Sequence, residues 1–147
     1  MSAEAGPART FESLAVGDAL PVVEQRLTRA DLKAYADASG DQNPIHQDEA
    51  VATSVGLPDV IAHGMLTMGL AGSAVEAWAG AGADAVQSFT TKFTAPVVVP
   101  AGVEAVVSIG GSVTALDADA RTATVEVSVT HEGAKVLGRA RAVVRFA

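Results

Sequence analysis

The stretch Gly64–Ala79, GMLTMGLAGSAVEAWA, is the most apolar helix candidate in the chain and decides the fold. Its only polar members are Thr67, Ser73 and Glu76. A helix that is apolar on nearly all sides belongs in a protein interior, because a surface helix keeps one polar face. We therefore predict a buried helix over residues 64–79, whose many Gly and Ala residues lower its bulk on every side.

The sequence around this helix predicts strands. Residues 122–130 alternate Ala and Val with Thr, Glu and Ser, which is the period-two pattern of a half-buried strand. The predicted strands are 22–27, 86–94, 103–116 with a bulge or bend at Gly110-Gly111, 122–130 and 134–146. Helices followed by a run of antiparallel strands are typical of an α+β fold. The sequence therefore predicts an antiparallel sheet curled around a buried central helix.

The chain has 147 residues, no Cys and a formal net charge of −7. This length suits one domain, which we place at residues 13–147 after a flexible N-terminal arm at residues 1–12. The absence of Cys excludes disulfides, thiolate metal sites and a Cys nucleophile. No run of Lys or Arg interrupts the acidic balance, so nucleic acid is not an expected partner. The N-terminus lacks a signal-peptide pattern and the apolar residues 64–81 include a charge, so we expect a cytoplasmic protein that does not enter membranes.

Two shorter helices are predicted before the apolar one. Thr28 and Asp31 have the spacing of a capping box, and Gly40 lies where a helix C-cap glycine belongs. Asp48 can cap a second helix over residues 49–55. The segment between these two helices is the most informative part of the chain for function.

This segment is SGDQNPIHQD, residues 39–48, and it contains the candidate catalytic residues Asp41 and His46. Gly40 and Pro44 restrict the backbone on both sides of Asp41, so the carboxylate and the imidazole can converge on one small volume. Addition of water to an enoyl thioester needs such a pair, because one proton leaves the water while another is delivered to C2. The pair therefore indicates a hydratase or dehydratase.

Two alternatives apply to the same segment. Asp-x-Asn-Pro is also ordinary turn chemistry after a helix, with His46 as a partly exposed surface residue. A metal site is the second alternative, and its ligands would be Asp41, His46, Asp48 and His63. The spacing of these ligands matches no standard metal motif, so we do not expect a metal.

The second informative segment is Ala62-His63-Gly64-Met65, where the apolar helix begins. The first N–H groups of a helix have no partner within the helix and lie at the positive end of its dipole. A thioester carbonyl placed there would have its developing negative charge stabilised, and Gly64 allows a close approach. The alternative is that Gly64 only helps the helix to pack and that His63 is a hydrogen-bonded core residue.

Alternation places Arg139, Arg141 and Arg145 on one face of the last predicted strand. Such a face fits the phosphates of CoA or the acidic surface of an acyl carrier protein. We favour the simpler interpretation of a solvated face, or of charge that protects an edge strand.

Tyr35, residues 39–48 and Ala62–Met65 resemble the hydratase-2 motif of the MaoC-like family, in the same order and at the same spacing. The resemblance extends over roughly residues 10–147. Within the family, residues 61–69 and Arg139-Ala140 are most similar to the catalytic B subunits of actinobacterial (3R)-hydroxyacyl-ACP dehydratases. Glu49 departs from the family pattern, in which Pro often follows the acidic residue, but this position starts a helix away from the chemistry.

The resemblance implies a single hot-dog fold and R-specific interconversion of trans-2-enoyl and (3R)-hydroxyacyl thioesters of CoA or acyl carrier protein, as in fatty-acid elongation. It implies that Asp41 and His46 bind and activate water and that the Gly64 N–H forms the oxyanion hole. The residues expected to bind substrate are Asn43, His63 and Met65. No metal or other cofactor is expected. The expected protein partner is a second hot-dog subunit, in a homodimer or a heterodimer.

Two other functions stay open. The first is an acyl-thioester hydrolase on the same fold, although hot-dog thioesterases do not show this Asp-x-Asn-Pro-x-His loop. The second is a non-catalytic acyl-binding subunit, which would be expected to lose Asp41 or His46, whereas this chain has both.

Overall fold

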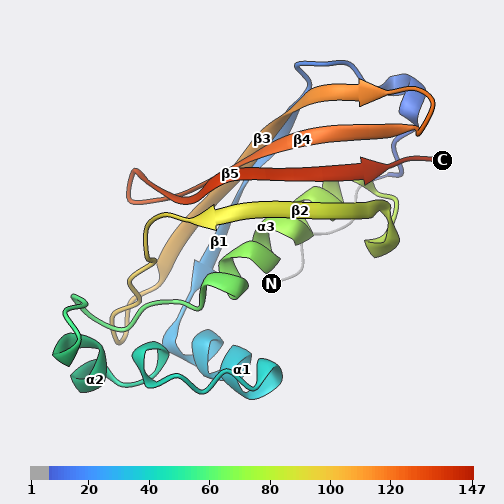
Figure 1. Cartoon of the computed structure of the whole chain (residues 1–147). Helices are drawn as coiled ribbons and strands as arrows, with labels where there is room; N and C mark the ends of the chain where they lie inside the picture. Colours follow the sequence, from blue (N-terminus) through green and yellow to red (C-terminus); the bar gives the residue numbers. More distant parts are fainter. Residues whose placement is uncertain (1–6) are drawn as a thin grey trace.

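A five-stranded antiparallel sheet curves around one long helix in the computed structural model, which describes residues 7–147 except for the Ala83 side chain (Figure 1). The elements in chain order are η1 (Phe11–Ser13), β1 (Ala19–Leu27), α1 (Arg29–Ser39), η2 (Pro44–His46), α2 (Glu49–Ser54), α3 (Gly64–Ala79), η3 (Ala83–Ala85), β2 (Val86–Phe93), β3 (Ala105–Asp117), β4 (Thr122–His131) and β5 (Ala134–Arg145). The α+β hot-dog prediction is confirmed, and the buried helix has the predicted bounds.

The strand order is β1-β3-β4-β5-β2, so β1 and β2 form the two edges of the sheet. The predicted strands all exist, but β1 begins at Ala19 rather than 22, and β3 begins at Ala105 rather than 103. Figure 1 shows α1 and α2 together beyond one end of the sheet, at the end where α3 begins. That arrangement brings the two informative segments of the sequence to the same end of the molecule.

The core is built from small and branched aliphatic side chains, as the scarcity of aromatic residues requires. The helix α3 contributes Leu66, Leu70, Ala71, Val75, Trp78 and Ala79 to it, and the sheet contributes mainly Val and Ala. Burial of an aliphatic side chain of this size stabilises the fold by about 1.5–3 kcal/mol relative to exposure. Packing against the sheet therefore fixes α3 despite its Gly residues, which lower its intrinsic helix propensity.

The predicted capping residues Thr28, Gly40 and Asp48 are confirmed, whereas α2 ends at Ser54 rather than 55. Thr28 and Asp31 form a reciprocal capping box at the start of α1, and Gly40 ends that helix in the left-handed conformation with φ 80°. The Asp48 carboxylate accepts hydrogen bonds from the backbone of Ala50 and Val51, so it caps α2. The Asp48 carboxylate is therefore bound by the start of its own helix and not by the candidate catalytic residues.

The Gly110-Gly111 pair does not form the predicted bulge in its own strand. The extra residue lies on β1, between Leu20 and Val23, opposite Gly110. Gly111 has a different role, because a Cβ there would lie 2.3 Å from the Glu126 carbonyl oxygen. Gly111 therefore permits close approach of the β4 backbone.

The predicted N-terminal arm falls partly outside the described residues, which begin at Pro7. Within the described part, the Arg9 backbone N–H donates to the carbonyl of Ala79. Glu12 pairs with Arg121 at 2.7 Å. Residues 7–12 thus contact the end of α3 and the β3–β4 turn, while the domain boundary itself stays a prediction.

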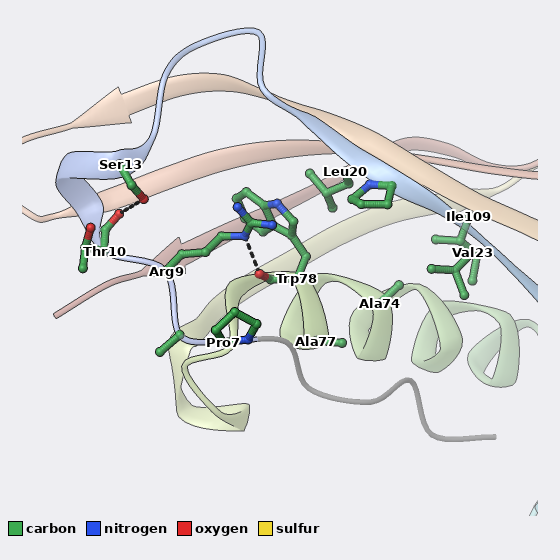
Figure 2. A pocket seen from close by; sticks show the side chains of 12 residues that line it. Pro7, Arg9, Thr10, Ser13, Leu20, Val23, Ala74, Ala77, Trp78 and Ile109 are labelled. Carbon is green, nitrogen blue, oxygen red and sulfur yellow. Dashed lines mark hydrogen bonds between the residues drawn. The ribbon is translucent and has the colours of Figure 1, made fainter.

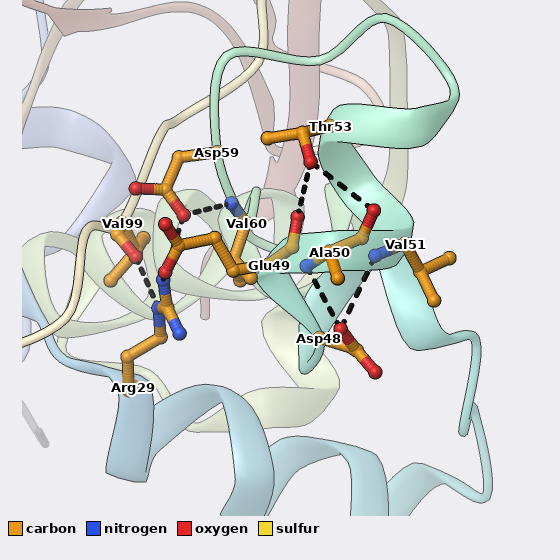
Figure 3. A network of polar contacts seen from close by, with 9 residues as sticks. All are labelled: Arg29, Asp48, Glu49, Ala50, Val51, Thr53, Asp59, Val60 and Val99. Carbon is orange, nitrogen blue, oxygen red and sulfur yellow. Dashed lines mark hydrogen bonds and ion pairs between the residues drawn. The ribbon is translucent and has the colours of Figure 1, made fainter.

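Arg29, at the start of α1, joins three segments that surround the candidate site (Figure 3). Its guanidinium pairs with Asp59 at 2.7 Å, lies 3.8 Å from Glu49 of α2, and donates to the Val99 carbonyl. The Asp59 carboxylate also accepts from the Val60 N–H at 2.7 Å. The network therefore fixes the segment that leads into residues 61–64.

Replacement of Arg29 by Met is expected to lower the free energy of unfolding by about 2 kcal/mol, because it leaves the largely buried Asp59 carboxylate without its charged partner. Urea denaturation of both proteins measures the loss. Lys33→Ala is the matched control, since its pair with Asp37 is exposed and is worth at most about 0.5 kcal/mol. Equal stabilities of the two variants would contradict a structural role for the Arg29 network.

Candidate active site

The loop between α1 and α2 is held by its own short polar side chains. The Asp41 carboxylate accepts from the Asn43 N–H at 3.1 Å, and the Asn43 side-chain oxygen accepts from the Ile45 N–H at 3.2 Å. These two bonds shape the turn that leads into η2, whose last residue is His46. The turn that these side chains form is therefore the same structure that brings Asp41 close to His46.

The His46 imidazole is buried, with 8% of the residue exposed. Its Nδ1 lies 2.7 Å from the Ile61 carbonyl oxygen. A carbonyl can only accept, so Nδ1 carries the proton in this hydrogen bond, and Nε2 is the ring nitrogen left for another partner. The sequence did not identify Ile61, because its backbone carbonyl rather than its side chain orients the imidazole.

His63 lies behind His46. The two rings stack with centroids 3.9 Å apart, and Tyr35 packs against His63 at 4.7 Å. The His63 Nε2–H donates to the Asp41 backbone carbonyl at 3.1 Å, and only 1% of the residue is exposed. His63 therefore connects the Asp41 loop to the start of α3 and supports the His46 ring from behind.

Asp41, His46 and His63 each bring a polar side-chain atom to within 4.8 Å of the other two. Such a set would suit a metal ion if the two imidazole lone pairs converged. A lone pair lies in the plane of its ring, and these ring planes are stacked only 26° from parallel. The lone pairs of the two imidazoles therefore lie in nearly parallel planes, which makes it difficult for both to be directed at one ion.

Burial lowers the pKa of His63 below its usual 6.5, and the neighbouring His46 adds a smaller lowering, against the raising effect of the hydrogen bond to Asp41. Below pH 6.5 the unfolded chain then binds more protons at this position than the folded chain. The free energy of unfolding is expected to fall as the pH drops below about 6.5 and to be at its full value above it.

Urea denaturation at pH 7.5 and 5.5 measures this dependence. His63→Gln keeps a donor for the Asp41 carbonyl but has no proton to gain, so its loss of stability over this interval should be smaller. The same loss in both proteins would show that folding does not lower the pKa of His63.

Gly64 is the first residue of α3, and among residues 7–147 its N–H donates to no acceptor. Gly64 and His46 line one cavity of about 330 Å³. The other walls come from Ile61, Ala62 and Thr67 and from the segment Phe93–Val97 with Val136. The cavity thus has a mainly apolar lining that includes the His46 imidazole and Gly64, whose N–H is unpaired among residues 7–147.

Thr67 and Phe93 are among the lining residues that were not predicted as site residues. The Thr67 hydroxyl donates to the Gly64 carbonyl at 2.6 Å. The Phe93 ring, 55% exposed, lies against Gly64, where a Cβ would be only 3.0 Å from it. Thr67 is recognisable as one of the few polar residues in an apolar helix, but nothing in the sequence places the end of β2 beside Gly64.

A model of the MaoC-like domain matches residues 13–134. The chain belongs to the MaoC-like family. This MaoC-like domain is similar to a solved MaoC-like dehydratase, with a TM-score of 0.91 and 44% identity over 98% of this chain and 44% of that one. It is also similar to the (R)-hydratase of A. caviae involved in PHA biosynthesis, with a TM-score of 0.77 and 28% identity over 92% of this chain and 99% of that one.

Among curated proteins, 3-hydroxyacyl-thioester dehydratase X of Mycobacterium tuberculosis is 40% identical over 81 residues, which are 55% of this chain and 28% of that protein. The 3-hydroxybutyryl-CoA dehydratase of Methylorubrum extorquens is 39% identical over 88 residues, 59% of this chain and 55% of that protein. The MaoC-like domain thus spans about a quarter of the mycobacterial relatives that it matches and about half of the other.

The remaining predicted residues lie around the cavity or apart from it. Asp41 is exposed beside His46 and Asn43 shapes its loop, but neither lines the cavity in this MaoC-like domain. Met65 is 56% exposed on the first turn of α3. Within residues 7–147, no helix has the length and apolar character needed to cross a membrane.

The arginine face of β5 is exposed, as the alternation predicted. Arg141 pairs with Glu126 of β4 at 3.1 Å, with both side chains more than half exposed. The edge-protection interpretation is wrong, because β5 lies between β4 and β2 inside the sheet of this MaoC-like domain. A solvated face is the interpretation that the structure favours.

Proposed function

We propose that this MaoC-like domain is an R-specific hydratase and dehydratase, which interconverts trans-2-enoyl thioesters and (3R)-hydroxyacyl thioesters. One observation carries the proposal: the unpaired Gly64 N–H and the His46 imidazole line the same cavity, with the Asp41 carboxylate beside that imidazole. The dehydratases and the hydratase among the relatives support the same reaction class.

The geometry suggests how the reaction proceeds. The thioester carbonyl accepts from the Gly64 N–H, which stabilises the negative charge that develops when C2 loses or gains a proton. His46 and Asp41 hold the water on the C3 side, where His46 Nε2 offers a lone pair and the Asp41 carboxylate offers a second acceptor. In dehydration the His46–Asp41 pair takes a proton from C2, the C2–C3 double bond forms, and the same pair returns a proton to the C3 hydroxyl, which leaves as water.

Asn43, His63 and Met65 take supporting roles in this proposal. His63 is a positioning residue, because it contacts His46 and the Asp41 loop rather than the cavity. Asn43 fixes the turn that presents Asp41. Met65, exposed on the first turn of α3, keeps the substrate-binding role that the resemblance implies.

An acyl-thioester hydrolase is the alternative to exclude. With crotonyl-CoA and a longer trans-2-enoyl-CoA, loss of the enoyl absorbance measures hydration and a thiol reagent measures hydrolysis. The proposal expects loss of absorbance without free thiol. Free thiol released in step with substrate loss would establish the hydrolase, and neither signal would favour a non-catalytic subunit. Carrier-protein substrates, fatty-acid elongation and a cytoplasmic location stay predictions.

A second hot-dog unit is part of the proposal. β2 is an unpaired sheet edge within the described chain, and Phe93 at its end and Met65 beside it are large exposed apolar side chains. Exposed edges and apolar patches of this kind are typical interfaces. A partner there would cover the open side of the cavity that Phe93 lines.

We expect a dimer by light scattering, and a shift toward the monomer in Phe93→Lys because a charge then enters the interface. Val22→Lys is the matched control, since Val22 is equally apolar and exposed but lies on β1 at the opposite edge. A stable, active monomer of the unchanged chain would contradict the dimer. Rescue of poor solubility by a co-expressed homologue would favour a heterodimer.

A further inference from the structure

A second cavity, of about 470 Å³, lies at the other end of α3 (Figure 2). Leu20, Val23 and Ile109 of the sheet form one wall, and Ala74, Ala77 and Trp78 of α3 form the opposite wall. Residues 7–10 and Ser13 line the remaining side. Its volume is within the range of about 300–1,000 Å³ that small-molecule sites occupy.

This cavity is separate from the candidate active site. The two cavities have no lining residue in common. Gly64 and Trp78 are fourteen residues apart on α3, which is roughly 21 Å along a helix axis. The short side chains of Ala74 and Ala77 leave the space open between the helix and β1.

Arg9 supplies a fixed positive charge to this apolar cavity. Its Nε–H donates to the Trp78 carbonyl at 2.7 Å, and its guanidinium lies 5.2 Å from the centre of the Trp78 ring. Figure 2 shows the side chain extending along the cavity to reach Trp78. Among residues 7–147, no carboxylate pairs with Arg9.

We propose that this cavity binds a single long-chain carboxylate, with the alkyl chain against Ala74, Ala77 and the sheet. The two terminal nitrogens of Arg9 donate to no described residue, and a guanidinium edge matches a carboxylate with two parallel hydrogen bonds. A guanidinium that has no carboxylate partner among residues 7–147 suits one negative charge, and the apolar walls suit a chain of methylenes rather than a polar ligand. The site goes beyond the proposed catalysis and does not depend on it.

The test uses dodecanoate below its micelle-forming concentration. Trp78 is the only Trp of the chain and lines the cavity, so its fluorescence reports occupancy directly. We expect a saturable change with one site per chain, confirmed by calorimetry. Dodecyltrimethylammonium, with a similar chain and the opposite charge, should give no saturable change.

Arg9→Gln should weaken dodecanoate binding about tenfold or more, the scale of a lost charged hydrogen bond, with unchanged hydration of crotonyl-CoA. Arg26→Gln, on β1 away from the cavity, is the matched control and should bind as the unchanged chain does. Ala74→Leu should abolish binding by filling the cavity, and if this variant fails to fold, the Arg9 comparison still decides.

Three results would overturn the proposal. The first is the absence of saturable binding, and the second is that Arg9→Gln and Arg26→Gln bind dodecanoate with equal affinity. The third is competition between dodecanoate and the enoyl thioester, which would place the dodecanoate in the catalytic cavity. Because binding is measured without turnover, failure of this site and failure of the proposed hydratase activity are distinguishable.

Discussion

Asp41→Asn and His46→Ala are each expected to lower the rate of hydration by about a hundredfold or more, the usual contribution of a general acid or base. His46 lines the cavity and its Nδ1 is held by the Ile61 carbonyl, which leaves Nε2 for the substrate, so loss of this residue removes the proposed proton carrier itself. Asp41→Asn keeps the size and the turn geometry of the side chain but removes its charge. Steady-state assays with crotonyl-CoA measure both losses.

The chain offers matched controls for both substitutions. His131 is as buried as His46, at 8% exposure, and its Nδ1 also donates to a carbonyl, that of Val106 at 2.8 Å. It lies in β4, outside the cavity, so His131→Ala should cost stability without comparable loss of turnover. Asp48→Asn keeps a good N-cap residue at α2 and should leave turnover near normal. Near-normal activity of a folded His46→Ala variant would make the assignment wrong.

Gly64→Pro is the second large effect, with an expected loss of about two to three orders of magnitude in kcat, the scale of one oxyanion donor. Proline is tolerated at the first position of a helix, where its missing N–H has no helical partner. The preceding residue, His63, already has the extended ψ of 132° that proline requires. Gly64 has no positive φ, so its backbone conformation admits other residues.

Gly64→Ala is the control that isolates the N–H group. A Cβ at position 64 meets the Phe93 ring at 3.0 Å in both variants, so this crowding cancels in the comparison. Only proline also removes the donor, so the ratio of the two kcat values measures the contribution of that N–H. Equal kcat values in the two folded variants would show that another group stabilises the carbonyl.

The sequence was sufficient for the architecture because each element carried a local signal. The apolar composition of residues 64–79 predicted the buried helix, and Thr28, Gly40 and Asp48 predicted the ends of the neighbouring helices. The order of sheet strands has no such local signal. For that reason the edge position, offered as one interpretation of the arginine face on the last strand, was wrong. The bulge predicted at Gly110-Gly111 lies instead on the partner strand β1.

Part of the site was also predictable. The spacing of Asp41 and His46 indicated convergence, and the start of the apolar helix indicated a free N–H at Gly64. The supporting contacts depend on segments far apart in the chain. The stack of His46 on His63 and the contact of Phe93 with Gly64 both join segments that meet only in the folded structure.

The cavity beside Arg9 illustrates the same limit. Its lining comes from the N-terminal segment, β1, α3 and β3. The sequence marked residues 1–12 only as an arm, because small residues with Gly and Pro give no indication of a tertiary contact. The bond from Arg9 to the Trp78 carbonyl is a tertiary interaction that no pattern within either segment encodes.

The most direct test of the proposed function is the initial rate of enoyl formation from (3R)- and (3S)-3-hydroxybutyryl-CoA, followed by ultraviolet absorbance. An R-specific dehydratase that uses His46 should form enoyl-CoA from the 3R substrate only, and His46→Ala should lose this rate while His131→Ala keeps it. Equal rates with the two enantiomers, or a rate that survives the loss of His46, would contradict the proposed chemistry.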